Sequence, residues 1–227
     1  MTEQILVFTL GAGFVLVHLL ASRMDWLDRT PRSLWLSTAG GVSIAYVFVH
    51  LLPELGHFSR DTELHAGLYV AALAGFVGFY GIEAHIRRTS DDDAAFRLHL
   101  TSYAGYNVVV GYLLDAQARE EPLAGLLFYA FALSLHLIIN DRALAERHGA
   151  RHAGGGRLTL AGSVATGVLV GAFVELPEAA VAVFFALLAG ATVLTVIKEE
   201  LPKQRQSRFG AFAGGALLYS VLLLLGF

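Results

Sequence analysis

Cysteine is absent from the 227-residue chain, which excludes disulfides, thiolate metal sites and thiol catalysis. Charged residues are scarce, at 15% of the chain, whereas 56% of residues are hydrophobic and the mean hydropathy is +0.60. A soluble globular domain carries more charge and fewer apolar residues. The chain also has no basic surface that would bind nucleic acid. The low content of charged residues and the high hydropathy favour an integral membrane protein, which is embedded in the lipid bilayer.

Eight apolar runs fill most of the sequence, and each approaches the roughly 20 residues that a helix needs to cross a bilayer. No loop between them is long enough for a soluble domain. We therefore expect residues 1–227 to form a single transmembrane domain, all α-helical, with eight transmembrane helices. The runs lie at residues 4–22, 33–52, 66–86, 99–117, 122–141, 158–175, 178–197 and 209–227.

Lysine and arginine fall almost entirely in every second loop. The first, third, fifth and seventh loops hold three, three, four and four of the 16, whereas the second and fourth hold one each and the sixth holds none. Because short cytoplasmic loops carry the excess of basic residues, these four loops are predicted to face the cytoplasm and both termini the outside. Arginine outnumbers lysine by 14 to 2, as in many GC-rich bacterial genomes, so we expect the bacterial inner (plasma) membrane.

The second and seventh runs resemble each other when Pro53 is aligned with Pro202, an offset of 149 residues that also places Gly41 on Gly190. The charge distribution gives the two runs opposite directions, which predicts an inverted repeat of three, two and three helices (3+2+3). In such architectures substrate sites lie near the midplane of the membrane, at the repeat interface. Chance recurrence of small residues in apolar helices is the alternative.

Polar side chains that could bind a ligand inside the membrane gather in the fourth and fifth runs. Asn107 lies near the middle of the fourth. His136 and Asn140 share one helical face of the fifth, and Asp141 is turned about 100° away. Ionisable groups within spans usually face a cavity or a partner, and these donors suit zinc, iron or manganese. A hydrogen bond from His136 to a neighbouring helix is the simpler alternative.

A second group of potential cation ligands lies at the outer end of the second run, where His50, Glu54 and His57 occupy positions i, i+4 and i+7. They could collect a cation at a vestibule or could be merely solvated. His148 and His152 are expected in a solvated, glycine-rich loop. Near the cytoplasmic helix ends, four residues could release an ion or anchor the helices: His18, Glu83, His85 and His99.

Together, the eight runs, the stretch STAGGVSIAYVFVHLLPE in the second and FALLAGATVLTVIKEELP in the seventh resemble the ZIP (Zrt/Irt-like) family of divalent-metal transporters. Its members build a transport site from motifs similar to His-Asn-x-x-Glu/Asp-Gly in the fourth span and His-Glu-x-x-His/Glu in the fifth. The stretches here are YNVVVG (106–111) and HLIIND (136–141). Asn107 and His136 match, whereas Tyr106 replaces a histidine and Val110 a carboxylate.

The resemblance implies a transporter that moves a divalent cation toward the cytoplasm by rocking one helical bundle against the other. Because several donors are replaced by residues that cannot compensate the ion's charge, we expect a reduced, mononuclear site. No tightly bound cofactor is expected, and Zn²⁺ or another divalent cation would be the substrate. The predicted metal ligands are His136, Asn107, Asn140, Asp141, His50 and Glu54.

Other functions stay open. A transport-inactive ZIP-fold protein with a sensing or interaction role, or a carrier of a different substrate, would also lack ligands. We do not expect an enzyme, because the chain has neither the His-Glu-x-x-His nor the Gly-x-Ser-x-Gly motif of hydrolases. Small residues four apart, such as Gly67, Ala71 and Gly75, permit close helix contacts, either in a homodimer or within one chain.

Overall fold

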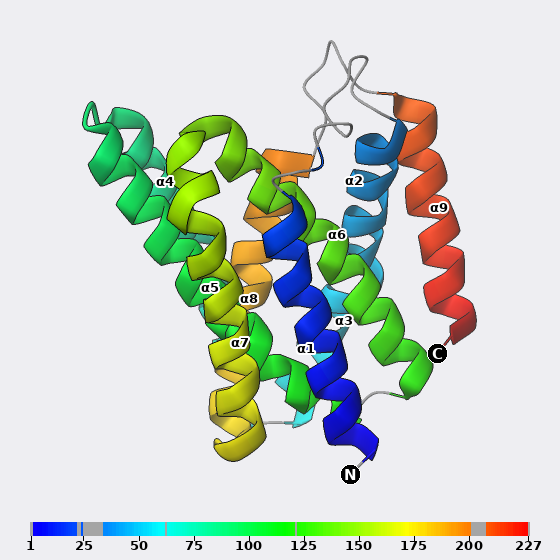
Figure 1. The fold of residues 1–227 in the computed structure, drawn as a ribbon. Helices are drawn as coiled ribbons and strands as arrows, with labels where there is room; N and C mark the ends of the chain where they lie inside the picture. The colour runs from blue at the N-terminus through cyan, green and yellow to red at the C-terminus, as the bar shows by residue number, and fades with distance from the viewer. Residues whose placement is uncertain are drawn as a thin grey trace.

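A computed structural model describes the chain at residues 2–21, 24, 34–61, 63–120, 122–200 and 208–226. Within these residues the chain is helical almost throughout and contains no β-strand, so the all-α prediction is confirmed. The helices stand side by side in one assembly (Figure 1). In chain order the elements, with π-helical segments written η, are α1 (Thr2–Ala21), α2 (Leu34–Tyr46), η2 (Val47–Leu51), α3 (Leu52–Asp61), α4 (Ala66–Arg88), α5 (Asp92–Glu120), α6 (Leu123–His148), η3 (His152–Gly156), α7 (Arg157–Phe173), α8 (Glu178–Thr195), η4 (Val196–Glu200) and α9 (Phe209–Gly226).

Six helical stretches in the described part of the chain are long and apolar enough to cross a membrane, by length and composition. Two further helices fall outside these limits. The helix α9 is apolar but shorter. The 29-residue α5 carries many polar residues, of which His99, Asn107, Asp115 and Gln117 are buried against its neighbours and most of the others are exposed toward its two ends. The chain therefore has the helices of an integral membrane protein.

The helices associate in two groups. Bundle one contains α1, α5, α6 and α7, in which α5 lies along α7 and α1 contacts both α6 and α7. Bundle two contains α2, α3, α4, α8 and α9, with α2 along α9 and α4 along α8. The two bundles meet where α5 contacts α4 and α8, and where α6 contacts α2. Any site between the bundles must be lined by these helices.

Glycine permits the closest contacts within the bundles. A Cβ atom at Gly190 of α8 would overlap the backbone of Ala72 in α4, and one at Gly75 of α4 would overlap the backbone of Leu187 in α8. Gly41 of α2 meets the backbone of α9 in the same way. Small residues allow such approach between helices in a membrane. Of the small residues expected at helix contacts, Gly75 therefore serves packing within the chain.

The segments η2 and η4 occupy equivalent positions in the predicted repeat. Val196–Glu200 begins and ends 149 residues after Val47–Leu51, which is the offset that aligns Pro53 with Pro202. Figure 1 shows that α2 begins, and α8 with η4 ends, at the upper end of the molecule, so the two run in opposite directions. This match supports the relation between the two stretches, although Pro202 itself lies outside the described residues.

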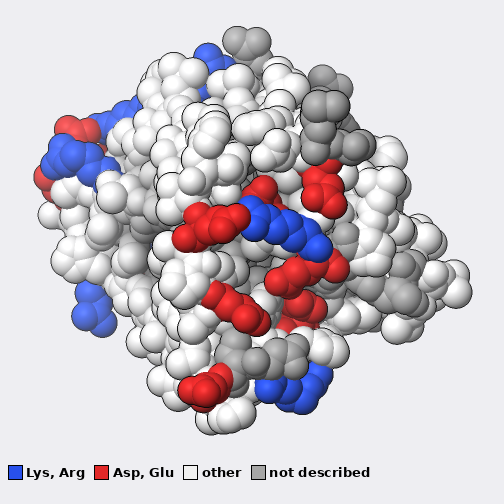
Figure 2. All heavy atoms as spheres, turned by 90° about the horizontal axis from the view of Figure 1, so that it is seen from below, with Lys and Arg blue, Asp and Glu red and all other residues white. Residues whose placement is uncertain are grey.

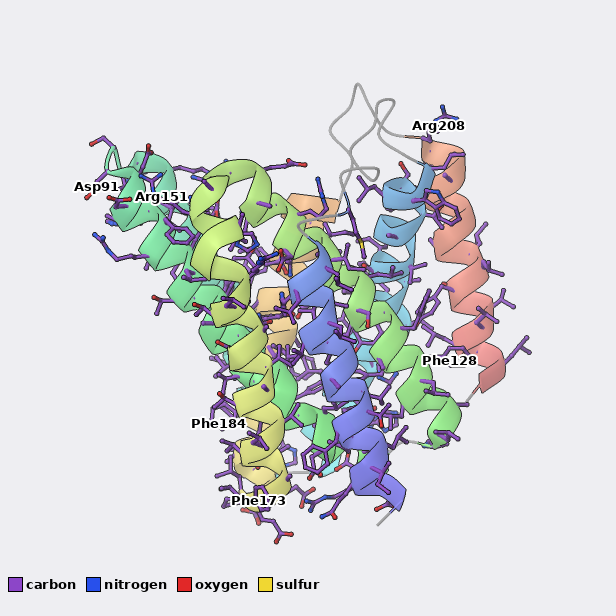
Figure 3. The ribbon with its side chains drawn as sticks, in the orientation of Figure 1. Asp91, Phe128, Arg151, Phe173, Phe184 and Arg208 are labelled. Atoms are coloured by element: carbon purple, nitrogen blue, oxygen red, sulfur yellow. The ribbon has the colours of Figure 1, made fainter. Side chains whose placement is uncertain are left out.

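Charged residues of three predicted cytoplasmic loops lie at one end of the molecule. Figure 3 shows Asp91, Arg151 and Arg208 at the upper end, whereas Phe173 lies at the lower end. Seen from below, the opposite end displays mainly acidic residues (Figure 2). The molecule therefore sorts its charges between its two ends, as expected of a chain that spans a bilayer.

Candidate functional site

The helices α5 and α6 each place two consecutive polar residues in the interior of the protein. Tyr106 and Asn107 are neighbours in α5, Asn140 and Asp141 are neighbours in α6, and all four side chains are buried. Consecutive residues of a helix point about 100° apart. As a result, one residue of each pair faces α8 of bundle two, and the other faces α1 of bundle one.

The first set of polar residues crosses the boundary between the bundles, and we call it the interface network. The hydroxyl of Tyr106 lies 3.1 Å from Nε2 of His136 and 2.8 Å from Oγ1 of Thr192. Asn140 Nδ2 lies 2.9 Å from the same His136 nitrogen, and Thr195 Oγ1 lies 3.4 Å from it. Tyrosine, histidine and asparagine come from bundle one and both threonines from α8, so this buried polar contact joins the two bundles.

The interface network consists of uncharged groups that could serve as metal ligands. It contains an imidazole, a phenol, a carboxamide and two hydroxyls, and no carboxylate. The amide oxygen Oδ1 of Asn140 is buried and has no hydrogen-bond partner among the described residues. A buried acceptor without a donor is costly, because the oxygen has given up its hydration. A cation held beside His136 would satisfy this oxygen.

The second set lies wholly inside bundle one, and we call it the inner network. Asp141 accepts a hydrogen bond from Nδ1 of His18 in α1 at 2.8 Å and another from Nε2 of His152 in η3 at 2.6 Å. Asn107 Nδ2 donates to Nε2 of His18 at 3.1 Å. Because a carboxylate only accepts, both imidazole nitrogens that face it must carry hydrogen. Asp141 therefore joins three elements of one bundle.

The solvated loop expected around His148 and His152 is wrong. The chain turns at Gly149, where α6 ends, and is helical again through η3 and α7, and the side chain of His152 is completely buried. Gly156 explains how the ring fits, since a Cβ atom there would lie 2.7 Å from Nδ1 of His152. His148 lies 2.8 Å from Nδ1 of His99. The glycines misled the prediction because only Gly149 forms a turn, whereas Gly154, Gly155 and Gly156 lie in η3 and Gly156 leaves room for the imidazole.

The expected outer group does come together. His50, Glu54 and His57 line one cavity of about 360 Å³, whose other wall is formed by Leu223 and Leu224 of α9. This cavity lies between α9 and the segments η2 and α3, inside bundle two. It therefore belongs to a different part of the structure from the interface network, which lies between the bundles.

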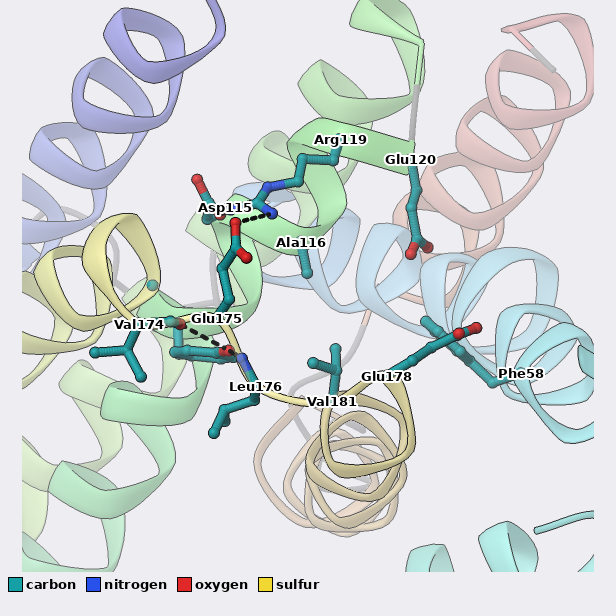
Figure 4. Close-up of a pocket in the computed structure, with 12 residues that line it drawn as sticks. Phe58, Asp115, Ala116, Arg119, Glu120, Val174, Glu175, Leu176, Glu178 and Val181 are labelled. Atoms are coloured by element: carbon teal, nitrogen blue, oxygen red, sulfur yellow. Dashed lines mark hydrogen bonds and ion pairs between the residues drawn. The ribbon is translucent and has the colours of Figure 1, made fainter. Parts of the chain in front are cut away.

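A second cavity, of about 170 Å³, lies between the bundles at the lower end (Figure 4). Asp115 and Arg119 of α5 line it from bundle one, together with Glu175 of the turn after α7, and Phe58 of α3 and Glu178 of α8 line it from bundle two. Arg119 lies 2.5 Å from Asp115 and 3.5 Å from Glu175. The mouth of the interface at this end is hollow and largely acidic.

The predicted metal ligands are thus divided among three places. His136 and Asn140 lie in the interface network, Asn107 and Asp141 in the inner network, and His50 and Glu54 beside α9. Across the residues that the structure describes, no group of three or more His, Cys, Asp or Glu side chains is arranged to hold a metal ion. A cation bound near His136 would have to rely on amide and hydroxyl oxygens.

Comparison with known proteins adds no assignment. No protein-family model matches the sequence, and no curated protein matches it. Membership of the ZIP family therefore stays a prediction, and the function must be argued from the geometry.

Sequence reasoning had singled out neither the threonines of α8 nor the phenol of Tyr106 as partners of His136. The sequence does contain a signal for Thr192. It aligns with Ser43 in the predicted repeat, and a polar residue at that position is unusual in so apolar a helix. His18 was noted only as a helix-end residue. A single histidine in an otherwise apolar helix is the feature that could have predicted its buried partner.

Proposed function

We propose that the protein is a ZIP-like membrane carrier that moves a divalent cation of the zinc, iron or manganese class toward the cytoplasm. The interface network carries this proposal. It brings polar donors of one bundle against hydroxyls of the other in the buried interior. A carrier that alternates between two openings by moving one bundle against the other needs its site at such a boundary.

The cation would be bound by Nε2 of His136, Oδ1 of Asn140 and the hydroxyl oxygens of α8. These are borderline and hard donors of the kind that zinc, iron and manganese accept. Because none of them is charged, they compensate little of the ion's charge, and weak binding with rapid release follows. The nearest carboxylate along the chain, Asp141, is turned into the inner network and would attract the ion only through space.

The proposal includes the full membrane topology. We propose eight crossings, both termini outside, an inverted 3+2+3 repeat and a place in the bacterial inner membrane. The equivalent π-helical segments η2 and η4 and the opposite directions of α2 and α8 support the repeat. The low hydropathy of α5 comes from buried polar residues in its interior and from exposed charged residues at its ends, which is consistent with a span shielded by its neighbours.

Purified protein in liposomes loaded with a metal-sensitive dye tests the proposal. We expect saturable influx of at least one of Zn²⁺, Fe²⁺ and Mn²⁺, and a decrease of about tenfold in His136→Ala, since a lost metal ligand costs on the order of 10- to 100-fold. His85→Ala is the matched control, because His85 is an exposed histidine of α4. Influx equal to that of empty liposomes for all three ions would overturn the proposal.

One observation favours a second candidate, a ZIP-fold protein that no longer transports metal and has a sensing or interaction role or carries a different substrate. The phenol of Tyr106 bonds both His136 and Thr192 and so occupies the place where a cation would bind. Metal-binding calorimetry on detergent-solubilised protein separates the two candidates. A micromolar site that disappears in His136→Ala and in Asn140→Ala counts against the second candidate, and its absence favours it.

A further inference from the structure

Glu83 gathers cations from several helices at the upper end of the molecule. Its Oε1 accepts hydrogen bonds from Arg87 at 3.2 Å and from Arg147 at 3.1 Å, and its Oε2 accepts from His99 at 3.0 Å and from Lys198 at 2.8 Å. Its side chain is only 10% exposed. Such charge-assisted bonds are stronger than those between neutral groups. Burial of the carboxylate reduces their screening, most for His99 and Lys198, because Arg87 and Arg147 are 62% and 37% exposed.

The partners of Glu83 come from both bundles. Glu83 lies in α4 and Lys198 in η4, both attached to bundle two, whereas His99 of α5 and Arg147 of α6 belong to bundle one. We call these four residues the Glu83 latch. A single carboxylate stands between Arg147 of bundle one and Lys198 of bundle two, so its removal would take away the anion that both cations share.

Aromatic rings continue the contact between the bundles from the latch down to the interface network. Phe79 lies one turn before Glu83 in α4, and its ring is centred 6.0 Å from that of Tyr103 and 5.9 Å from that of Tyr106. The ring of Tyr103 in turn is centred 6.1 Å from that of His99. These edge-on contacts are typical of well-packed aromatic pairs. These rings connect the latch to the tyrosine that bonds His136, and beside them Phe79 and Tyr106 line an apolar cavity of about 380 Å³ between α4, α8 and α5.

The boundary between the two bundles contains an acidic cavity at its lower end and ion pairs at its upper end. At the lower end, the acidic cavity of about 170 Å³ separates α5 from α3 and α8. At the upper end, the latch and the aromatic rings join α4 and η4 to α5 and α6. An alternating carrier requires this asymmetry, because only one side of its site can be open at a time.

We propose that the Glu83 latch is the gate on the predicted cytoplasmic side, which must open before cargo bound at the interface network is released. This inference rests on the proposed carrier function. The latch differs from a merely structural contact in one respect. It joins the two bundles, whereas the more deeply buried inner network joins elements of bundle one only. Breaking the latch should expose the interface network without dismantling either bundle.

The absence of cysteine makes a direct test possible. Thr195→Cys places one thiol in the chain, beside His136 and three residues before Lys198, at a position that is buried behind the latch. A membrane-impermeant maleimide is applied separately to each side of sealed membrane vesicles. The side that carries the latch is identified with a second reporter, Glu146→Cys, which is exposed at the end of α6 next to Arg147.

Labelling of Thr195→Cys should be slow with the latch intact and about tenfold faster from the latch side when Glu83→Gln is added, because the latched state loses its advantage over the open one. The matched control adds Glu146→Gln instead. This change removes a carboxylate at the same end that is exposed and is not part of the latch, so the rate should stay within about twofold of the parent. Equal rates in the two variants, or a rise from the opposite side only, would overturn the gate.

Folding is checked by size-exclusion chromatography. If Glu83→Gln does not fold, Arg147→Gln and His99→Gln each remove one connection between the bundles and should raise the rate about threefold. Unchanged rates in both then overturn the gate. The labelling needs no transported metal, so the two proposals fail separately. Faster labelling without metal influx in the wild type supports the gate and rejects metal as cargo, whereas influx without faster labelling rejects the gate alone.

Discussion

Replacement of Asp141 by alanine should destabilise bundle one more than any exposed substitution on the same helix. The carboxylate holds His18 of α1 and His152 of η3 at 2.8 and 2.6 Å, and all three side chains are at most 1% exposed. Hydrogen bonds between helices in membranes average about 0.6 kcal/mol and reach about 1.7 kcal/mol. Asp141→Ala removes two charge-assisted bonds near the upper value and leaves two imidazole N–H groups without acceptors. The free energy of unfolding should therefore fall by about 4 kcal/mol.

The assay is the midpoint of thermal unfolding in detergent, read as the folded fraction that remains in size-exclusion chromatography after heating. For a chain of this length about 1 kcal/mol shifts the midpoint by roughly 2–4 °C, so Asp141→Ala should lower it by about 10 °C. Asp141→Asn keeps the shape and one acceptor oxygen, and should lower the midpoint by about 3 °C. Glu146→Ala, at an exposed position of the same helix, is the control and should leave the midpoint within about 2 °C.

An Asp141→Ala midpoint no lower than that of Glu146→Ala would refute this reasoning. It would mean that the carboxylate does not hold α1 and η3 to α6, or that the two histidines find other acceptors at no cost. A larger loss in Asp141→Asn than in Asp141→Ala would be equally contrary, because the amide retains more of the native contacts than the methyl group does.

Gly190→Ala should destabilise the contact of α8 with α4, because its Cβ would overlap backbone, whereas Gly78→Ala, with nothing within 4 Å, should leave the unfolding midpoint unchanged. Tyr106→Phe removes the hydroxyl that bonds His136, so metal binding measured by calorimetry should tighten; weaker binding would assign the phenol to the metal site. Two backbone N–H groups at the start of α5 hold the pKa of the Asp91 carboxyl below its usual range. The ionised carboxylate stabilises the fold above the ordinary carboxyl pKa, and this stabilisation is lost as the pH falls through the lowered value. The midpoint of thermal unfolding should therefore fall less at acidic pH in Asp91→Asn than in the wild type.

The positions of the helices followed from hydrophobic length. The run at residues 66–86 is found as Ala66–Arg88, because a long apolar stretch in a membrane protein has no alternative to a helix that satisfies its own backbone. Helical periodicity also predicted correctly that His136 and Asn140 face together while Asp141 points elsewhere. Both results depend only on geometry within one helix.

What could not be predicted depends on pairings between distant helices. Asp141 meets His18, 123 residues earlier in the chain, and no local pattern specifies that partner. Glu83 was expected at a helix end, but its role as the meeting point of two bundles follows from how α4, α5, α6 and η4 pack. The burial of His152 depends on a π-helical turn whose glycine makes room for the ring, and such turns leave little trace in hydrophobic periodicity.

The proposed cation site between the bundles can be located directly by anomalous diffraction from crystals grown with zinc or manganese. For zinc, we predict one peak about 2.0–2.1 Å from Nε2 of His136, on the side of α8, that is absent from crystals of His136→Ala. Anomalous density confined to the cavity beside His50 and Glu54, with none near His136, would contradict the account.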